Sequence, residues 1–228
     1  RQIRIKQLTK REREAQRVLF DVWFPGKARI RLTSFICSEC GFMCYSPRPE
    51  EKDISRKYAS FVQSDRNIGS REEYNQYQKH LDNKRRAGIY KIIMSYSASQ
   101  PLTVLDYKGG NGKLLTPFLK TNNKCYVVDY NEKVLPGIIK AGSTIADIPQ
   151  DLSFDVFILS HVLEHIAQPV KLLESLKAFA TPDSIFYIEV PLEVWAGIRI
   201  GPDPVTHINY FSKPSFLRLL RQAGYKLL

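Results

Sequence analysis

Hydrophobic and polar positions follow different patterns before and after Pro101. Beyond Pro101, short apolar runs alternate with amphipathic stretches, which predicts strands alternating with helices. We expect strands at 102–106, 125–129, 154–159 and 184–190, with a weak one near 143–146, and helices at 113–120, 131–141, 169–180 and 214–223. This alternation is typical of an α/β fold with a parallel, doubly wound sheet. The segment YKLL at 225–228 begins another strand, so we expect residues to be missing at the C-terminus.

The first hundred residues lack this alternation. Residues 1–19 predict a basic helix, and residues 34–49 hold three cysteines and end in a proline-rich breaker. The polar, proline-free stretch 50–96 predicts two helices, the second at about 71–96. We therefore expect three parts: a basic N-terminal arm with a cysteine knuckle at 1–49, a helical cap or linker at 50–97, and the main domain at 98–228.

A glycine-rich turn follows an apolar run that ends in an acid, in the stretch VLDYKGGNG at 104–112. In nucleotide-binding α/β domains such a turn lets the backbone approach a ligand closely, and the next helix points free N–H groups at it. Asp129 closes the second strand, where a carboxylate can accept both ribose hydroxyls, although a solvent-facing acid is also common there. An NAD site requires G-x-G-x-x-G, and the glycines at 109, 110 and 112 fit that spacing less well.

Three later motifs make the pattern more specific. They are SHVLEHI at 160–166, IFYIEVP at 185–191 and HINYFS at 207–212. Together with the glycine-rich turn, they resemble class I S-adenosylmethionine-dependent methyltransferases, in a branch that often acts on nucleotide-linked sugars and other small metabolites. That branch often carries a cysteine-bearing segment ahead of the catalytic domain, so the resemblance covers about residues 34–228. It implies a Rossmann-like, mostly parallel sheet with an N-terminal helical and cysteine-knuckle extension, S-adenosyl-L-methionine as cofactor, and a small-molecule acceptor that is sugar-like or nucleotide-linked.

The resemblance also implies which residues contact the cofactor. These are Asp106, Gly110 and Gly112 along the methionine and ribose, Asp129 at the ribose hydroxyls, Asp147 beside the adenine, and Ser160 and His161 on the sulfonium side. One position departs from the family pattern, because Lys108 stands where a glycine is usual. The lysine side chain can point outward, contact the cofactor carboxylate or block the pocket. In the last case the chain is a non-catalytic, methyltransferase-like binding module.

Three of the four histidines lie in these motifs, namely His161, His165 and His207. Methyl transfer from a sulfonium is an in-line displacement, and an O–H or C–H acceptor needs a general base to remove its proton. Histidine suits this task near neutral pH. We expect His207 to be the base, with Tyr210 as a second candidate, and His165 to brace its loop more than to react.

Three cysteines lie close together, at Cys37, Cys40 and Cys44. The first two have the spacing of a zinc knuckle, but a structural zinc site needs four ligands and no further Cys or His stands nearby. Two readings stay open: a structural zinc ion completed from elsewhere, and a knuckle that persists as a metal-free turn.

The net charge of +11 is spread unevenly. Residues 1–33 carry ten basic and three acidic residues, whereas residues 96–228 carry thirteen and twelve. Nucleic-acid enzymes more often place positive charge around the active site, so a small-molecule acceptor is favoured, and an RNA methyltransferase that uses the basic arm is the alternative. No apolar run approaches the ~20 residues of a membrane span and no signal peptide is visible, so we expect a cytoplasmic protein without a membrane partner. The oligomeric state and the methylated atom stay open.

Overall fold

The computed structural model describes residues 31, 33–50, 52–54, 56, 72–97, 101–192 and 207–228, with the helix backbone alone at 72–81. The basic helix expected at 1–19 lies outside these residues, as does most of the first helix expected between 50 and 96. The chain divides into two compact units. We call residues 61–162 and 175–189 the sheet unit, and residues 1–60, 163–174 and 190–228 the hairpin unit.

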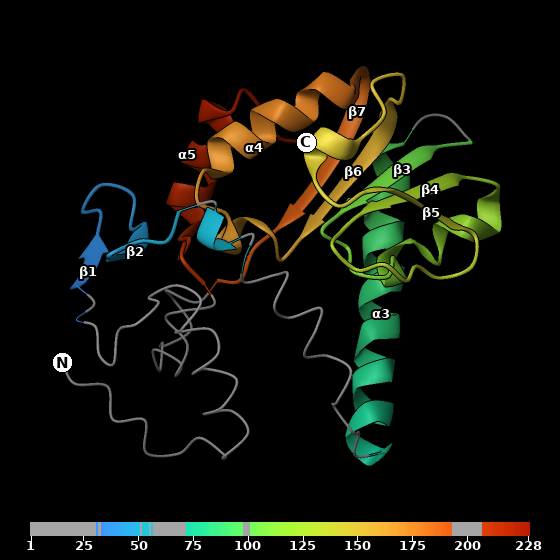
Figure 1. Ribbon diagram of the computed structural model, residues 1–228, viewed down its shortest axis with the longest axis horizontal. Coiled ribbons are helices and arrows are strands. Elements are labelled where there is room, and N and C mark those ends of the chain that lie inside the picture. The colour runs from blue at the N-terminus through green and yellow to red at the C-terminus, as the bar shows by residue number, and fades with distance from the viewer. Residues whose placement is uncertain are drawn as a thin grey trace. The chain divides into compact units, whose positions relative to one another are not determined.

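The sheet unit is built on five parallel strands in the order β5-β4-β3-β6-β7, which run side by side in Figure 1. Their bounds are Thr103–Tyr107 for β3, Lys124–Val128 for β4, Ile138–Gly142 for β5, Phe154–Ser160 for β6 and Ala180–Glu189 for β7. The chain continues from β3 to β4 on one side, and β6 pairs with β3 on the other. The prediction of a doubly wound parallel α/β sheet is therefore confirmed. In such sheets ligands bind outside the carboxyl ends of the strands where the order reverses, which here is the end of β3.

Helix α3, Glu72–Tyr96, packs on the core of this unit through residues spaced one turn apart. Ile89 and Ile93 are 3% and 1% exposed and belong to the cluster that contains Val104, Val127 and other buried residues of the strands. Because side chains four positions apart lie on the same helix face, this apolar stripe also sets which polar residues of α3 point toward the sheet.

Two helices expected from the sequence are absent. Residues 113–120 form two short 3-10 turns, Lys113–Leu115 and Phe118–Thr121, because Pro117 between them has no N–H to continue a helix. Residues 131–141 form no helix in the structure, which describes all of them. Pro136 ends the amphipathic pattern and Gly137 takes a φ of +83°, so the chain turns directly into β5. The weak strand expected near 143–146 does not form there, and the strand of this region, β5, lies earlier, at Ile138–Gly142.

The remaining elements lie close to their expected places. Helix α4 covers Pro169–Leu176 and a 3-10 turn extends it to Phe179. Helix α5, Lys213–Gln222, begins at Ser212, whose side chain accepts a hydrogen bond from the backbone N–H of Ser215. The strand expected at 225–228 does not form. None of the helices in the described part of the chain combines the length and apolarity that a bilayer crossing requires.

The hairpin unit contains the antiparallel strands β1, Thr33–Ile36, and β2, Met43–Ser46. Met43 also exchanges two backbone hydrogen bonds of 3.0 Å with Tyr210, which ties the hairpin to the segment that precedes α5. The Ser212 hydroxyl donates to the carbonyl of Cys40 in the hairpin turn. The cysteine hairpin and the last helix thus form one packed body.

Candidate functional site

The turn after β3 folds directly over Asp106. Gly110 and Gly112 take left-handed φ values of +62° and +83°, and Lys108 takes +60°. A Cβ added at Gly109 would lie 2.6 Å from Oδ1 of Asp106 and nearer still to Oδ2. Glycine is required at 109 by this close approach of backbone to carboxylate.

Asp106 is an unusual carboxylate because it is only 1% exposed. Burial, and then the negative charge of Asp129, raise its pKa to about 8, while Arg85 acts in the opposite direction. Among the residues that the structure describes, none donates a hydrogen bond to either of its oxygens. A buried acid in this state suits a ligand that brings a hydrogen-bond donor or a positive charge.

Asp129 follows β4 and is held by the same turn. Its Oδ2 accepts a hydrogen bond of 3.1 Å from the backbone N–H of Gly110, and its Oδ1 accepts one of 2.8 Å from Asn131. A carboxylate has about four lone pairs, so these two bonds leave acceptor capacity for a ligand hydroxyl.

Asp147 braces the loop after β5. Its Oδ2 accepts hydrogen bonds from the N–H of Ser143, at 3.0 Å, and from both the N–H and the hydroxyl of Thr144. These bonds lower the pKa of Asp147. The Asp147 carboxylate therefore stabilises the loop to which it belongs.

The Lys108 side chain runs along the carboxyl edge of the sheet. Its ammonium donates to the carbonyl of Ser143, at 3.1 Å, and lies 3.6 Å from the centroid of the Tyr130 ring. The side chain of Lys108 therefore reaches the loop that holds Asp147.

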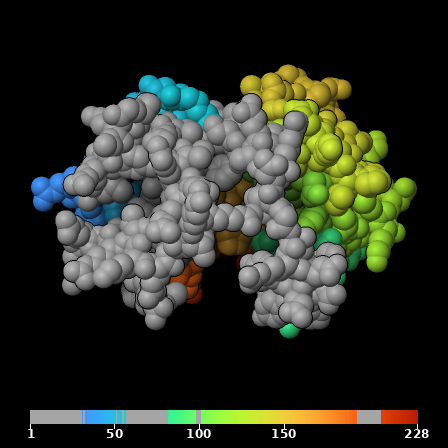
Figure 2. Space-filling model, turned by 60° about the horizontal axis from the view of Figure 1, so that its bottom comes forward, coloured from blue at the N-terminus to red at the C-terminus, as the bar shows by residue number. Residues whose placement is uncertain are grey.

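A pocket opens beside the turn. It is lined by Asp82, Arg85, Arg86, Asp106, Lys108, Gly109, Lys113, Leu114, Ser160 and His161. Four of these residues are cationic and two are acidic, so the pocket favours a ligand with an anionic group. Three of the residues predicted to contact the cofactor line it, whereas Gly110, Gly112, Asp129 and Asp147 lie outside this lining. In the space-filling view the β4 and β5 part of the sheet unit is the green to yellow surface (Figure 2).

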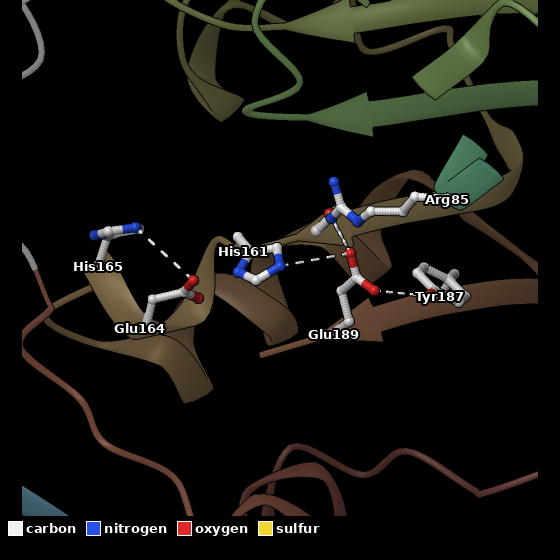
Figure 3. Close-up of polar contacts among 7 residues, drawn as sticks. Arg85, His161, Glu164, His165, Tyr187 and Glu189 are labelled. Carbon is white, nitrogen blue, oxygen red and sulfur yellow. Dashed lines mark hydrogen bonds and ion pairs between the residues drawn. The ribbon is translucent and has the colours of Figure 1, made fainter. Parts of the chain in front are cut away.

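Glu189, at the end of β7, has Arg85, His161 and Tyr187 around its carboxylate (Figure 3), and the first two of these line the pocket. Its Oε1 accepts from Arg85 and, at 2.5 Å, from the Ser160 hydroxyl, and its Oε2 accepts from Tyr187 at 2.8 Å. Burial alone would raise the pKa of Glu189, but these hydrogen bonds hold it below its ordinary value. Nε2 of His161 lies 3.9 Å from Oε1. The carboxylate therefore stays charged and orients Arg85.

Sequence reasoning missed Arg85 and Glu189, which are 104 positions apart. A signal for Arg85 does exist in the sequence. It stands four and eight positions before Ile89 and Ile93, so it continues the sheet-facing stripe of α3 by one turn.

A second cluster lies in the hairpin unit. Glu164 and His165 belong to the 3-10 turn Leu163–His165, and the chain returns to them just after His207. The backbone N–H groups of Ile208 and Asn209 both donate to the carbonyl of Glu164, at 2.8 and 3.1 Å.

The side chain of Asn209 adds further hydrogen bonds between the same two segments, and we call this set of bonds the clamp. It is 1% exposed and its Nδ2 donates to the carbonyls of Leu163 and Ile166, at 2.6 and 2.7 Å. Its Oδ1 accepts from Arg48 at 2.5 Å. The loop that carries His207 is therefore held by a buried amide.

The clamp brings Glu164, His165 and His207 together, with a ligand atom of each within 4.8 Å of the others. The His165 and His207 rings have centroids 4.8 Å apart. Nε2 of His165 lies 3.8 Å from Oε1 of Glu164, a contact drawn in Figure 3. Tyr210 is 5% exposed, with its ring 6.4 Å from that of His207 and 5.6 Å from that of Tyr45. The three predicted catalytic residues therefore lie in one neighbourhood, with Tyr210 packed into it.

The cysteines lie on the hairpin. Gly41 donates its N–H to the carbonyl of Cys37, which closes a tight turn that also contains Cys40, and Cys44 pairs with Phe35 in the β1–β2 ladder. Backbone and side-chain hydrogen bonds from Cys40 lower the pKa of Cys37. In the described ranges, the group of three metal-ligating side chains that comes together contains none of these thiols. The zinc site stays a prediction.

Comparisons with known proteins agree on the kind of domain. A family model described as a methyltransferase domain matches residues 76–228. Comparison with curated protein sequences gives no significant match.

Solved structures share the fold. The 1,6-didemethyltoxoflavin-N1-methyltransferase of Burkholderia thailandensis, solved with bound 1,6-didemethyltoxoflavin and S-adenosylhomocysteine, is 17% identical, with a TM-score of 0.55 over 87% of this chain and 90% of that chain. A SAM-dependent methyltransferase from Archaeoglobus fulgidus is 21% identical, with a TM-score of 0.51 over 67% and 74% of the two chains. At these identities the likeness establishes the Rossmann-like fold.

Proposed function

The chain belongs to the methyltransferase domain family, and on that premise we propose that it transfers a methyl group from S-adenosyl-L-methionine to a small-molecule acceptor. The observation that carries the proposal is the buried Asp106 carboxylate beneath the glycine-rich turn, with no hydrogen-bond donor among the described residues and a cationic pocket beside it. When bound, the cofactor supplies an electrophilic methyl group on its sulfonium.

The residues around this turn fit the cofactor's charged groups. Asp106 would face the ammonium of the methionine part, whose positive charge would bring the pKa of this carboxyl back down. Arg85 and Arg86, both in the pocket wall, would hold the methionine carboxylate, since guanidinium groups match carboxylates in shape and charge. The remaining lone pairs of Asp129 would accept the ribose hydroxyls.

On the acceptor side, we keep His207, His165 and Tyr210 as the proposed catalytic residues. The two imidazoles lie together beside Glu164, and the buried Tyr210 ring supports them. A proton acceptor at this cluster would serve an O–H or C–H acceptor. We further propose a sugar-like or nucleotide-linked acceptor, a proposal supported by the family resemblance of residues 160–166 and 207–212.

Lys108 favours one rival function, a non-catalytic binding module. Its side chain lies over Tyr130 and bonds to Ser143, on the edge where Asp129 and Asp147 would receive the nucleoside. A cofactor bound along that edge has to displace the ammonium.

Calorimetric titration with S-adenosylhomocysteine tests the proposal and its rival together. We expect micromolar binding by the unaltered chain and tighter binding by Lys108→Gly, which removes the side chain and relieves a left-handed residue. Lys108→Met is the matched control, because it keeps the length of the side chain but loses the charge. Binding by Lys108→Gly alone would favour the non-catalytic module, and no binding by any folded variant would overturn the methyltransferase proposal.

A further inference from the structure

Glu164, His165 and His207 have the composition of a metal site. Two imidazoles and one carboxylate from a 3-10 turn and a distant loop converge so that their ligand atoms lie within 4.8 Å of one another. We propose that these three side chains bind a divalent first-row transition ion, such as Zn²⁺, Mn²⁺ or Fe²⁺. The family match assigns no ion here, and the proposal holds whether or not the chain transfers methyl groups.

The geometry needs only side-chain adjustment. Metal–ligand bonds to histidine and carboxylate are about 2.0–2.2 Å, which places neighbouring ligand atoms roughly 3–3.5 Å apart. Nε2 of His165 is already 3.8 Å from Oε1 of Glu164. Closing the set therefore takes rotations of the imidazole and carboxylate groups, while the backbone stays in place.

The backbone is also prepared for this role. The carbonyl of Glu164 accepts two N–H groups from the residues that follow His207, and Asn209 fastens the same loop to Leu163 and Ile166. A site whose ligands are already held together loses little entropy on binding.

Charge supplies the second argument. Glu164 is 0% exposed, and a carboxylate removed from water is costly unless positive charge lies close to it. An ion on the two imidazoles would place a double positive charge next to this buried group. Imidazole nitrogen favours transition ions, whereas Mg²⁺ and Ca²⁺ favour oxygen ligands alone.

An ion with three protein ligands has open positions for water or an acceptor oxygen. A metal-bound hydroxyl loses its proton at lower pH than a free one. With an ion bound, His165 and His207 would act as ligands and not as bases, and a hydroxyl held on the ion would release its proton to solvent.

Titration of the full chain with Co²⁺, without cofactor, tests the site directly. We expect one equivalent to bind with visible bands of a nitrogen and oxygen ligand set and no intense thiolate-to-cobalt band. Glu164→Gln, which keeps the side chain's size, and His207→Gln should each weaken binding at least tenfold, since loss of an outer partner alone costs about 10- to 100-fold. His165→Gln removes the third ligand, whose side chain is 15% exposed, and should also weaken Co²⁺ binding.

Two matched controls separate this site from other ligands in the chain. Cys37→Ser with Cys40→Ser removes the thiols, and His161→Gln removes a histidine that lies outside the cluster, so both should bind Co²⁺ as the unaltered chain does. Excess Mg²⁺ should not displace the ion. Circular dichroism in metal-free buffer establishes that each variant is folded.

The proposal is overturned by either of two results: absence of nitrogen- and oxygen-type bands in the chain that carries Cys37→Ser with Cys40→Ser, or unchanged affinity in folded Glu164→Gln and His207→Gln. Failure of cofactor binding alone would leave it intact, because the titration needs no cofactor.

Discussion

Asp106 and Glu164 are both buried carboxylates, 1% and 0% exposed, yet the chain builds their surroundings in different ways. Asp106 is covered by Gly109, three residues further along the same turn. Glu164 meets its neighbour His165 in sequence, but His207 arrives from a loop 43 positions away that a buried asparagine holds. The first site depends on local backbone conformation and the second on a long-range clamp.

Gly109→Ala should have the largest effect, because it strikes the local site where backbone and carboxylate meet. The new Cβ would overlap the carboxyl group of Asp106, so the turn has to move. We expect the free energy of unfolding to fall by about 3–5 kcal/mol, in the range of the most damaging single substitutions, and binding of S-adenosylhomocysteine to be lost.

Urea unfolding and calorimetry measure both effects. Gly110→Ala is the matched control, since an added Cβ there meets nothing within 4 Å and only the φ of +62° is strained. It should cost about 1–2 kcal/mol. A loss at 109 no larger than the loss at 110 would mean that the added Cβ does not collide with Asp106.

Asp106→Asn tests the buried carboxylate of the local site through the pH dependence of the free energy of unfolding. The pKa of Asp106 in the folded chain is about 8, against an ordinary value of 3.8, so the folded state prefers the neutral acid. Stability linked to this group is fully present below pH 4 and is lost as the pH rises toward 8, by at most about 1.4 kcal/mol per pH unit.

Asparagine has no such titration, so the variant should gain stability relative to the unaltered protein by a few kcal/mol between pH 5 and pH 8. Chemical unfolding at several pH values gives the two curves. Parallel curves would show that Asp106 is charged and solvated at neutral pH, contrary to its burial.

Asn209→Ala tests the long-range clamp. It removes the donor to two buried carbonyls, those of Leu163 and Ile166, and should cost about 1–3 kcal/mol. Because the clamp positions His207, Co²⁺ affinity should fall as well, and the spectroscopic titration measures this. Retained affinity in a destabilised variant would show that the His207 loop is held without the clamp.

Gly88→Ala should have the smallest effect and the opposite sign. An added Cβ at this exposed position in α3 meets nothing within 4 Å, and alanine favours helix over glycine by about 0.5–1 kcal/mol. Thermal unfolding should show a small rise in the midpoint. A loss instead would mean that part of the cost at Gly109 belongs to glycine replacement in general.

Some parts of the fold follow from local patterns and others do not. The apolar runs at β3 and β6 are fully buried, and such runs identify central parallel strands from sequence alone. Most residues of β5 were expected to belong to a helix at 131–141, because a prediction from apolar periodicity alone takes no account of Pro136 and Gly137. Its strand conformation depends on pairing with β4, and pairing is a property of the assembled sheet.

The candidate site divides in the same way. The family resemblance implied that Ser160 and His161 lie on the sulfonium side of the cofactor, and in the structure both line the pocket beside Asp106. Arg85 and Glu189 were missed as partners: the apolar stripe of α3 indicates that Arg85 faces the sheet, but it does not indicate that the guanidinium meets the end of β7.

By itself, the sequence determined the central strands β3, β4 and β6, the glycine-rich turn and the acids at the ends of β3 and β4, because each depends on conformational preferences over a few neighbouring residues. Only the tertiary structure decided that Lys108 reaches Ser143, that Arg85 meets Glu189, and that His207 joins Glu164 and His165. These contacts join residues 35 or more positions apart, and their distances follow from strand register, helix packing and loop closure, which no short stretch of sequence specifies.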